Sequence, residues 1–165
     1  MSYAEGTTVS AEKSRAEIET MVTKYAGRDA EFGLMRADGQ AVILFAAHGR
    51  RLKFIVPLPS MDEAKRDAGD GRSPNSKPSP GRCEEWIEQE TRRRWRCMCL
   101  AIKAKFVAVE SGSFTFEEEF LSHLVRPDGR TIYESIQAAV ADGSRLLPAV
   151  EDGKVVSITG KALRP

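Results

Sequence analysis

The sequence has few of the residues that hold metal ions or disulfide frameworks. Of its 165 residues, three are cysteine and two are histidine. Cys97 and Cys99 stand two positions apart in a predicted helix, where side chains point about 200° away from each other, so they cannot share a small metal ion. No HExxH, CxxC or HxH spacing is present. We therefore expect reduced thiols, no metal site and no cofactor.

Long apolar runs and a charge excess are also missing. No segment approaches the roughly 18 apolar residues of a membrane span, and the first residues, MSYAEGTTVSAEK, do not have the apolar run of a signal peptide. We expect a cytoplasmic protein with no membrane partner. Lys and Arg number 25 against 24 Asp and Glu. The total charge therefore does not indicate a nucleic-acid partner, and any electrostatic argument must rest on clustering.

Signatures of catalysis are likewise absent. The chain has no nucleophile elbow, no GxGxxG motif and no P-loop. Cys83, near the start of a predicted helix, is the one thiol that a helix dipole would activate. His48 in a turn and His123 in a short helix are best interpreted as structural or solvated. We expect a binding protein rather than an enzyme, although carboxylates and histidines that meet only on folding would leave no sequence signature.

The longest segment without proline or internal glycine predicts one long helix, from Arg82 to Gly112. Apolar side chains recur on one side at the spacing of a helix that faces a core. Basic side chains gather nearly opposite. The apolar stripe consists of Thr91, Trp95, Met98, Cys99, Ile102, Phe106 and Val109.

The remaining pattern predicts a single α+β domain over residues 1–165. Ser10 caps an N-terminal helix that ends before Gly27. Period-two alternation from Glu31 to Leu58 predicts a three-stranded antiparallel meander, with the long helix packed on the sheet. Residues 60–81 are rich in proline and glycine and predict a flexible loop. Residues 146–165 are either a loose tail or a hairpin about 152–153.

Two capping boxes predict two short helices after the long one. The first begins at Thr115 with Glu118 as its reciprocal partner. The second begins at Thr131 with Glu134, and we expect it to bury an apolar side formed by Ile132, Ile136 and Val140.

The basic residues of the long helix, on its first turns beside the loop, are the main candidate site. A phosphate backbone requires several cations along one surface. The alternative is that glutamates one turn back neutralise the arginines, as the Glu88 and Arg92 spacing suggests. Trp95 falls on the apolar stripe, which favours a core position over a base platform. The candidate residues for binding nucleic acid or a protein partner are Arg92, Arg93, Arg96, Lys103, Arg51, Lys53, Arg72 and Lys77.

Several stretches resemble a family of small uncharacterised proteins encoded by bacteriophages and prophages. The resemblance covers residues 8–148 and is carried by SAEKSRAEIE, RLKFIVPLP, RRRWRCMCLAIKAKFVAVESG, TFEEEFLSHLV and PDGRTIYESI. It implies a phage accessory protein in a bacterial cytoplasm. We expect it to bind nucleic acid, with single-stranded DNA as one candidate, or alternatively to inhibit a host defence or recombination complex through protein–protein contacts. The sequence leaves the oligomeric state open.

Overall fold

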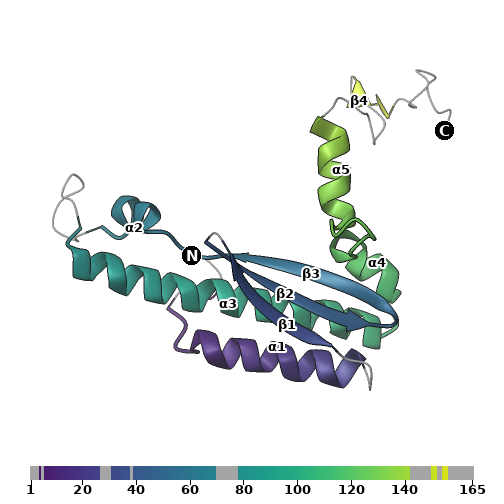
Figure 1. Ribbon diagram of the computed structural model, residues 1–165, viewed down its shortest axis with the longest axis horizontal. Helices are drawn as coiled ribbons and strands as arrows, with labels where there is room; N and C mark the ends of the chain where they lie inside the picture. The colour runs from purple at the N-terminus through teal and green to yellow at the C-terminus, as the bar shows by residue number, and fades with distance from the viewer. Residues whose placement is uncertain are drawn as a thin grey trace.

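The chain is a mixed α+β protein. The computed structural model describes residue 4 and residues 6–26, 31–37, 39–69, 78–141, 150–151 and 154–155. A three-stranded antiparallel sheet in the order β1-β2-β3 has helices packed on one face (Figure 1). The elements are α1 (Ala11–Ala26), β1 (Phe32–Ala37), β2 (Gln40–Ala47), β3 (Arg50–Pro57), α2 (Met61–Asp67), α3 (Pro80–Glu110), α4 (Phe116–Phe120), the 3₁₀ turn η2 (Leu121–His123), α5 (Ile132–Ala141), β4 (Val150–Glu151) and β5 (Lys154–Val155).

The predicted meander is confirmed, with β2 in its centre. Phe45 pairs with Phe32 of β1 and with Leu52 of β3, and the three side chains lie on the inner face of the sheet. The β2–β3 turn is tight, because His48 and Gly49 both have positive φ angles of 51° and 70°. Such a pair is typical of a two-residue hairpin turn whose twist matches the flanking strands. The register therefore fixes which side chains face the helices.

The core lies between the inner face of the sheet and helices α1 and α3. Trp95, Cys99, Ile102 and Phe106 of α3 are buried there, as the predicted stripe requires. Helix α1 packs along α3 and contributes Ile18 and Val22. Phe116 and Phe120 of α4 close the far end of the same cluster.

The long helix begins two residues earlier than predicted. Ser79 is its N-cap and accepts a hydrogen bond from the Arg82 amide at 3.3 Å. Pro80 occupies the first turn, where a missing N–H costs nothing. The helix ends at Glu110, and Gly112 takes the left-handed conformation common after a helix C-terminus, with φ 73°.

Part of the segment predicted as a flexible loop is helical. Ser60 and Glu63 form a capping box at the start of α2, and Ala64 of that helix is fully buried. The prediction was wrong for residues 61–67. The loop-like composition of the segment outweighed two local signals, the Ser60–Glu63 capping box and the small residue Ala64, which is buried in a helix that packs on α3. Residues 70–77 of the predicted loop lie outside the described residues.

The last helix corrects a second prediction. The Thr131–Glu134 capping box is present, with the Thr131 amide donating to Glu134 at 2.6 Å. However, Ile136 and Val140 are 45% and 56% exposed rather than buried. Helix α5 projects away from the layers of sheet and helices (Figure 1). A periodic apolar side thus shows that a helix has a contact face, but not that its own chain covers it. Strands β4 and β5 pair antiparallel on either side of residues 152–153. The predicted turn itself and residues 146–149 and 156–165 of the predicted tail lie outside the described residues.

Substitutions in the buried stripe of α3 should destabilise the protein more than substitutions on its exposed side. Ile102→Ala removes a fully buried side chain and should lower the free energy of unfolding by about 2–5 kcal/mol. Val107→Ala, at a position that is 47% exposed in the same helix, should change it by less than about 0.5 kcal/mol. Urea denaturation of both variants measures the difference. Equal losses would contradict the burial described for α3.

Candidate functional site

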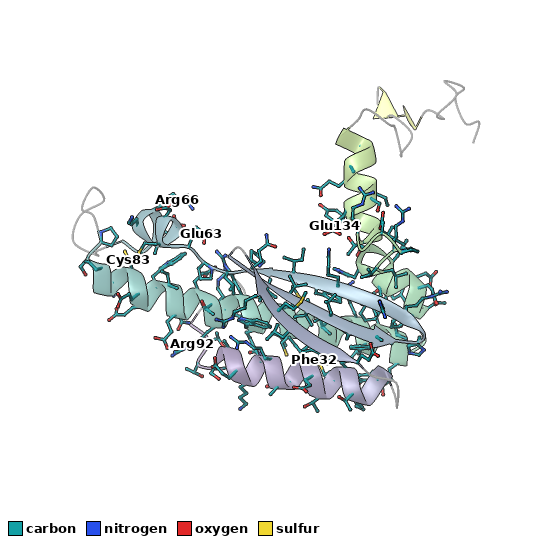
Figure 2. The ribbon with its side chains drawn as sticks, in the orientation of Figure 1. Phe32, Glu63, Arg66, Cys83, Arg92 and Glu134 are labelled. Atoms are coloured by element: carbon teal, nitrogen blue, oxygen red, sulfur yellow. The ribbon has the colours of Figure 1, made fainter. Side chains whose placement is uncertain are left out.

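The arginines of the predicted basic site are held by carboxylates of the same chain. Arg92 pairs with Glu88 one turn earlier, as the alternative interpretation of the sequence predicts, and points outward from α3 (Figure 2). Arg93 donates from Nε to Glu90 at 2.6 Å. Arg96 donates to Glu17 of α1 at 2.6 Å. Each of these three cations therefore meets an anion within hydrogen-bond distance.

Arg94, which is not among the predicted candidate residues, contacts three different elements. It donates to Glu90 at 2.8 Å, to Glu63 of α2 at 2.9 Å and to the Pro57 carbonyl oxygen at 3.2 Å. The Glu90 side chain is only 13% exposed between Arg93 and Arg94. The hydrogen bond from Arg93 holds the pKa of Glu90 below its ordinary value, and Arg94 adds to the effect. This network joins α2, α3 and the end of β3, which is a structural role.

Two of the three cysteines, Cys83 and Cys99, are buried. The Cys99 thiol donates to Glu17 at 3.4 Å, and burial raises its pKa to about 11. The thiolate, which is the nucleophilic form, is therefore scarce at neutral pH. Cys83 is buried on the side of α3 that faces α2 (Figure 2). The helix-dipole interpretation of Cys83 needs an accessible thiol, and the structure does not provide one.

Trp95 is a core residue. Its side chain is 1% exposed, and the guanidinium of Arg15 lies over its ring at 4.7 Å from the centroid. A base platform must present its face to solvent. Trp95 is therefore unavailable for stacking, as its position on the apolar stripe predicts.

The eight predicted site residues do not come together as one surface. Arg92, Arg93 and Arg96 lie on the first half of α3. Arg51 and Lys53 lie on the opposite side of the sheet, on its outer face. Lys103 is an exposed residue of α3, which packs on the inner face. Arg72 and Lys77 lie outside the described residues. The described cations therefore lie on separate surfaces of the sheet and of α3.

The outer face of the sheet is lined with apolar side chains beside a cavity. One row across the strands consists of Met35, Val42 and Ile55. The next row consists of Gly33, Leu44 and Lys53, and Gly33 has no side chain to fill the space beside Leu44. Met35 is 54% exposed. A cavity of about 650 Å³ opens over these rows.

The start of α5 forms a wall at the β3 edge of this face. The Val125 amide donates to the Arg51 carbonyl oxygen at 2.8 Å, so residues 124–125 lie beside the strand. Lys53 pairs with Glu134 of α5 at 2.8 Å. Figure 2 labels Glu134 at the start of α5. The Lys53 hydrogen bond holds the pKa of Glu134 below its ordinary value, with the Thr131 amide as the next cause. The sheet and α5 therefore meet at a concave corner. We call this surface the outer corner; it consists of Met35, Val42, Leu44, Lys53 and Ile55 of the sheet and Tyr133 and Glu134 of α5.

A smaller cleft of about 440 Å³ lies in the outer corner between Ile55, His123 and Tyr133. His123 stacks on Phe54 with ring centroids 3.9 Å apart. Burial lowers the pKa of His123, and the charge of Lys105 acts in the same direction, so its ring is neutral at pH 7. His48 lies against Phe116 at 4.5 Å. Both histidines therefore pack against aromatic rings, in line with the structural interpretation.

The sequence contains a signal for the outer corner that lies in its apolar residues and not in its charges. Alternation along β3 places Lys53 and Ile55 on the outer face, and β2 adds Val42 and Leu44 there. A sheet face that is covered by solvent is usually more polar than this. An apolar outer face is therefore the feature that points to a partner.

Comparisons with known proteins give no relative from which a function could be inferred. No protein-family model, curated protein or solved structure matches the chain. Within the described ranges, no group of three or more His, Cys, Asp or Glu side chains is placed to hold a metal ion. None of the helices in those ranges combines the length and apolar character needed to cross a membrane.

The Glu90 network should make stability depend on pH. Glu90→Gln leaves Arg93 and Arg94 without their shared charge and should lower the free energy of unfolding at pH 7 by about 1–3 kcal/mol. Because the folded-state pKa of Glu90 is lowered, its contribution is present above the unfolded-chain pKa of about 4.3 and disappears as pH falls through the folded value. The gap between wild type and variant should therefore close toward pH 3.

Glu88→Gln is the matched control, since the Glu88 carboxylate is mostly exposed beside Arg92. It should change stability by less than about 0.5 kcal/mol at either pH. Urea denaturation at pH 7 and pH 3 measures both variants. A Glu90→Gln deficit that is the same size at both pH values would contradict the assignment.

Proposed function

We propose that this protein is a non-enzymatic accessory protein that binds another protein through the outer corner. The observation that supports it is the apolar outer face of the sheet, with Met35, Val42 and Leu44 beside a cavity and next to an exposed apolar helix. Interfaces are depleted of charge at their centre and surrounded by polar residues. The outer corner has that composition, with Arg51 and Glu31 at the border of the cavity.

We favour protein binding over nucleic-acid binding on the chain's own charges. Phosphate contacts require cations that are available to the ligand. Arg92, Arg93 and Arg96 would each have to give up a carboxylate of this chain before meeting a phosphate. The nucleic-acid hypothesis stays a prediction. The ion pairs within the chain weaken its support, because they already neutralise these arginines.

The resemblance to phage and prophage proteins suggests where the partner is found. We propose a phage-encoded protein that acts in a bacterial cytoplasm on a host protein complex, in defence or recombination. An inhibitor of such a complex works by occupying a surface, for which a rigid apolar corner is sufficient and catalytic residues are not needed.

A charge placed at the centre of the outer face should abolish partner binding. Leu44→Glu puts a carboxylate where a partner would have to desolvate it and should weaken binding at least about tenfold. Val107→Glu, on the exposed side of α3, is the matched control and should bind like wild type. Affinity capture from bacterial lysate identifies a protein held by wild type and control but lost with Leu44→Glu. Titration with that protein in purified form measures the affinities.

The same purified proteins also test the nucleic-acid hypothesis. We expect no saturable binding of single-stranded oligonucleotides at low salt. Salt-sensitive oligonucleotide binding that is lost in Arg92→Gln, but kept in Leu44→Glu, would contradict the proposal and support the basic cluster as the site.

A further inference from the structure

Strand β1 lies at the border of the sheet, and every second residue of it directs its backbone groups away from β2 (Figure 1). The Glu31 carbonyl oxygen accepts a hydrogen bond from the Ala46 amide of β2 at 3.0 Å. Backbone groups alternate in direction along a strand. The N–H and C=O groups of Phe32, Leu34 and Arg36 therefore face outward. Within the described ranges, no backbone group of the chain pairs with them.

The opposite edge of the sheet is covered by the chain itself. The Val125 amide donates to the Arg51 carbonyl oxygen of β3 at 2.8 Å, and Leu124 forms a bridge with Leu52. Among the described residues, β1 has no such cover, and its six pairs with β2 run without a bulge. Natural proteins often protect an edge strand with proline, lysine or a bulge. Strand β1, with the sequence FGLMRA, contains none of these. Its edge is therefore an open template for one more strand.

We infer that the protein partner of the outer corner contributes an extended segment that adds to β1 as a fourth strand. This inference rests on the proposed function, because it names how the same partner is held. In this mode of recognition, main-chain hydrogen bonds give affinity and side chains at alternate positions give specificity. The edge adjoins the outer corner through Met35, which is 54% exposed. A strand beside β1 therefore continues the surface that the partner covers and does not compete with it.

The exposed side chains of β1 determine the chemistry of this segment. Leu34 pairs with Ile43 on the inner face of the sheet, yet it is 36% exposed. The partner residue opposite Leu34 should therefore be apolar. Arg36 lies two residues further on the same face, is exposed, and forms no ion pair with a carboxylate in the described part of the chain. The residue opposite Arg36 should be acidic, since opposite charges across a strand pair are stabilising. The segment is thus an extended peptide with an apolar and an acidic residue two positions apart.

A peptide segment fits this edge better than a second copy of the chain. Helix α1 lies on the inner side of the sheet near β1. A backbone hydrogen bond lowers the pKa of Glu12 at the start of α1, and the charge of Arg36 near the end of β1 adds to this effect. A second copy paired through its own β1 would bring a second α1 to the same side. A single extended strand requires only the strand spacing of about 4.8 Å.

Peptides selected on the full chain from a display library of random ten-residue sequences test the inference. We expect bound sequences with the apolar and acidic spacing described. Only every second amide of an added strand faces β1, so N-methylation of alternate peptide residues probes the pairing directly. In one phase it removes two or more main-chain hydrogen bonds and should weaken binding at least about tenfold. In the other phase it should leave binding unchanged. Equal effects in both phases, or the absence of any selected peptide, would overturn the inference.

Hydrogen exchange followed by NMR gives the matching observation on the protein. In the free chain, the amides of Gly33 and Met35 face β2 and should exchange slowly. Those of Phe32, Leu34 and Arg36 should exchange quickly, and saturating peptide should slow them at least about tenfold. Without peptide, protection of these three amides that rises with protein concentration would show that a second copy occupies the edge. That result would overturn the peptide segment as its occupant.

A charge exchange tests the assigned side-chain contact. Arg36→Glu should weaken binding of an acidic selected peptide about threefold or more, and the same peptide with lysine at the acidic position should recover it. Arg50→Glu, at an exposed position of β3, is the matched control and should bind like wild type. Circular dichroism confirms that each variant is folded. An acidic peptide that binds Arg36→Glu as tightly as wild type would contradict the inferred contact.

The outcome is distinguishable from that of the proposed function. A captured protein that depends on Leu44 but stays bound when the selected peptide saturates β1 would overturn the strand addition and leave the proposed function intact. A peptide that binds β1 in the expected phase, while no captured protein depends on Leu44, would support the edge as a peptide site and overturn the proposed function.

Discussion

Packing of the α3 stripe against the inner face of the sheet decides which surfaces of this protein remain for binding. Ile102 and Phe106 are buried in that contact, and α1 covers the remainder of the inner face with Ile18 and Val22. A three-stranded sheet packed on two helices on one side still has a second face. The apolar residues of that second face, among them Val42 and Leu44, have no role in the core. They form the surface on which the proposed protein partner binds.

The basic side of α3 illustrates how a charge cluster can be structural. Arg93 and Arg94 share Glu90, and Arg94 also reaches Glu63 of α2. A partly buried carboxylate between two guanidinium groups offsets the cost of removing each charge from water. The network holds α2 against α3. Its arginines are paired with carboxylates of the same chain and are therefore less available to a phosphate backbone. Local charge counting is consequently a poor guide to function in this helix.

Much of the fold was predictable because its signals are local. The capping boxes at Thr115 and Thr131, the stripe on α3 and the alternation in β2 and β3 each depend on residues close in sequence. The α2 helix escaped prediction because its seven residues lie within a composition typical of loops. The exposure of Ile136 was not predictable, since the direction in which α5 leaves the sheet depends on two isolated bridges, one between Leu124 and Leu52 of β3 and one between Val125 and Thr131.

The candidate site was harder to predict for a related reason. Glu88 lies one turn from Arg92, so that ion pair follows from spacing alone. The pairing of Arg96 with Glu17 and of Arg94 with Glu63 joins residues far apart in the chain. Only the fold shows that these carboxylates neutralise the cluster, and only the fold places the α5 stripe next to an apolar sheet face.

The most direct measurement follows the methyl NMR signals of isotope-labelled protein while the unlabelled protein captured from lysate is added. Binding shifts or broadens the signals of side chains at the interface. The account predicts that the methyl groups of Val42, Leu44 and Ile55 on the outer face are among those that change. Changes confined to other methyl groups, such as those of Val107 on α3, would contradict it.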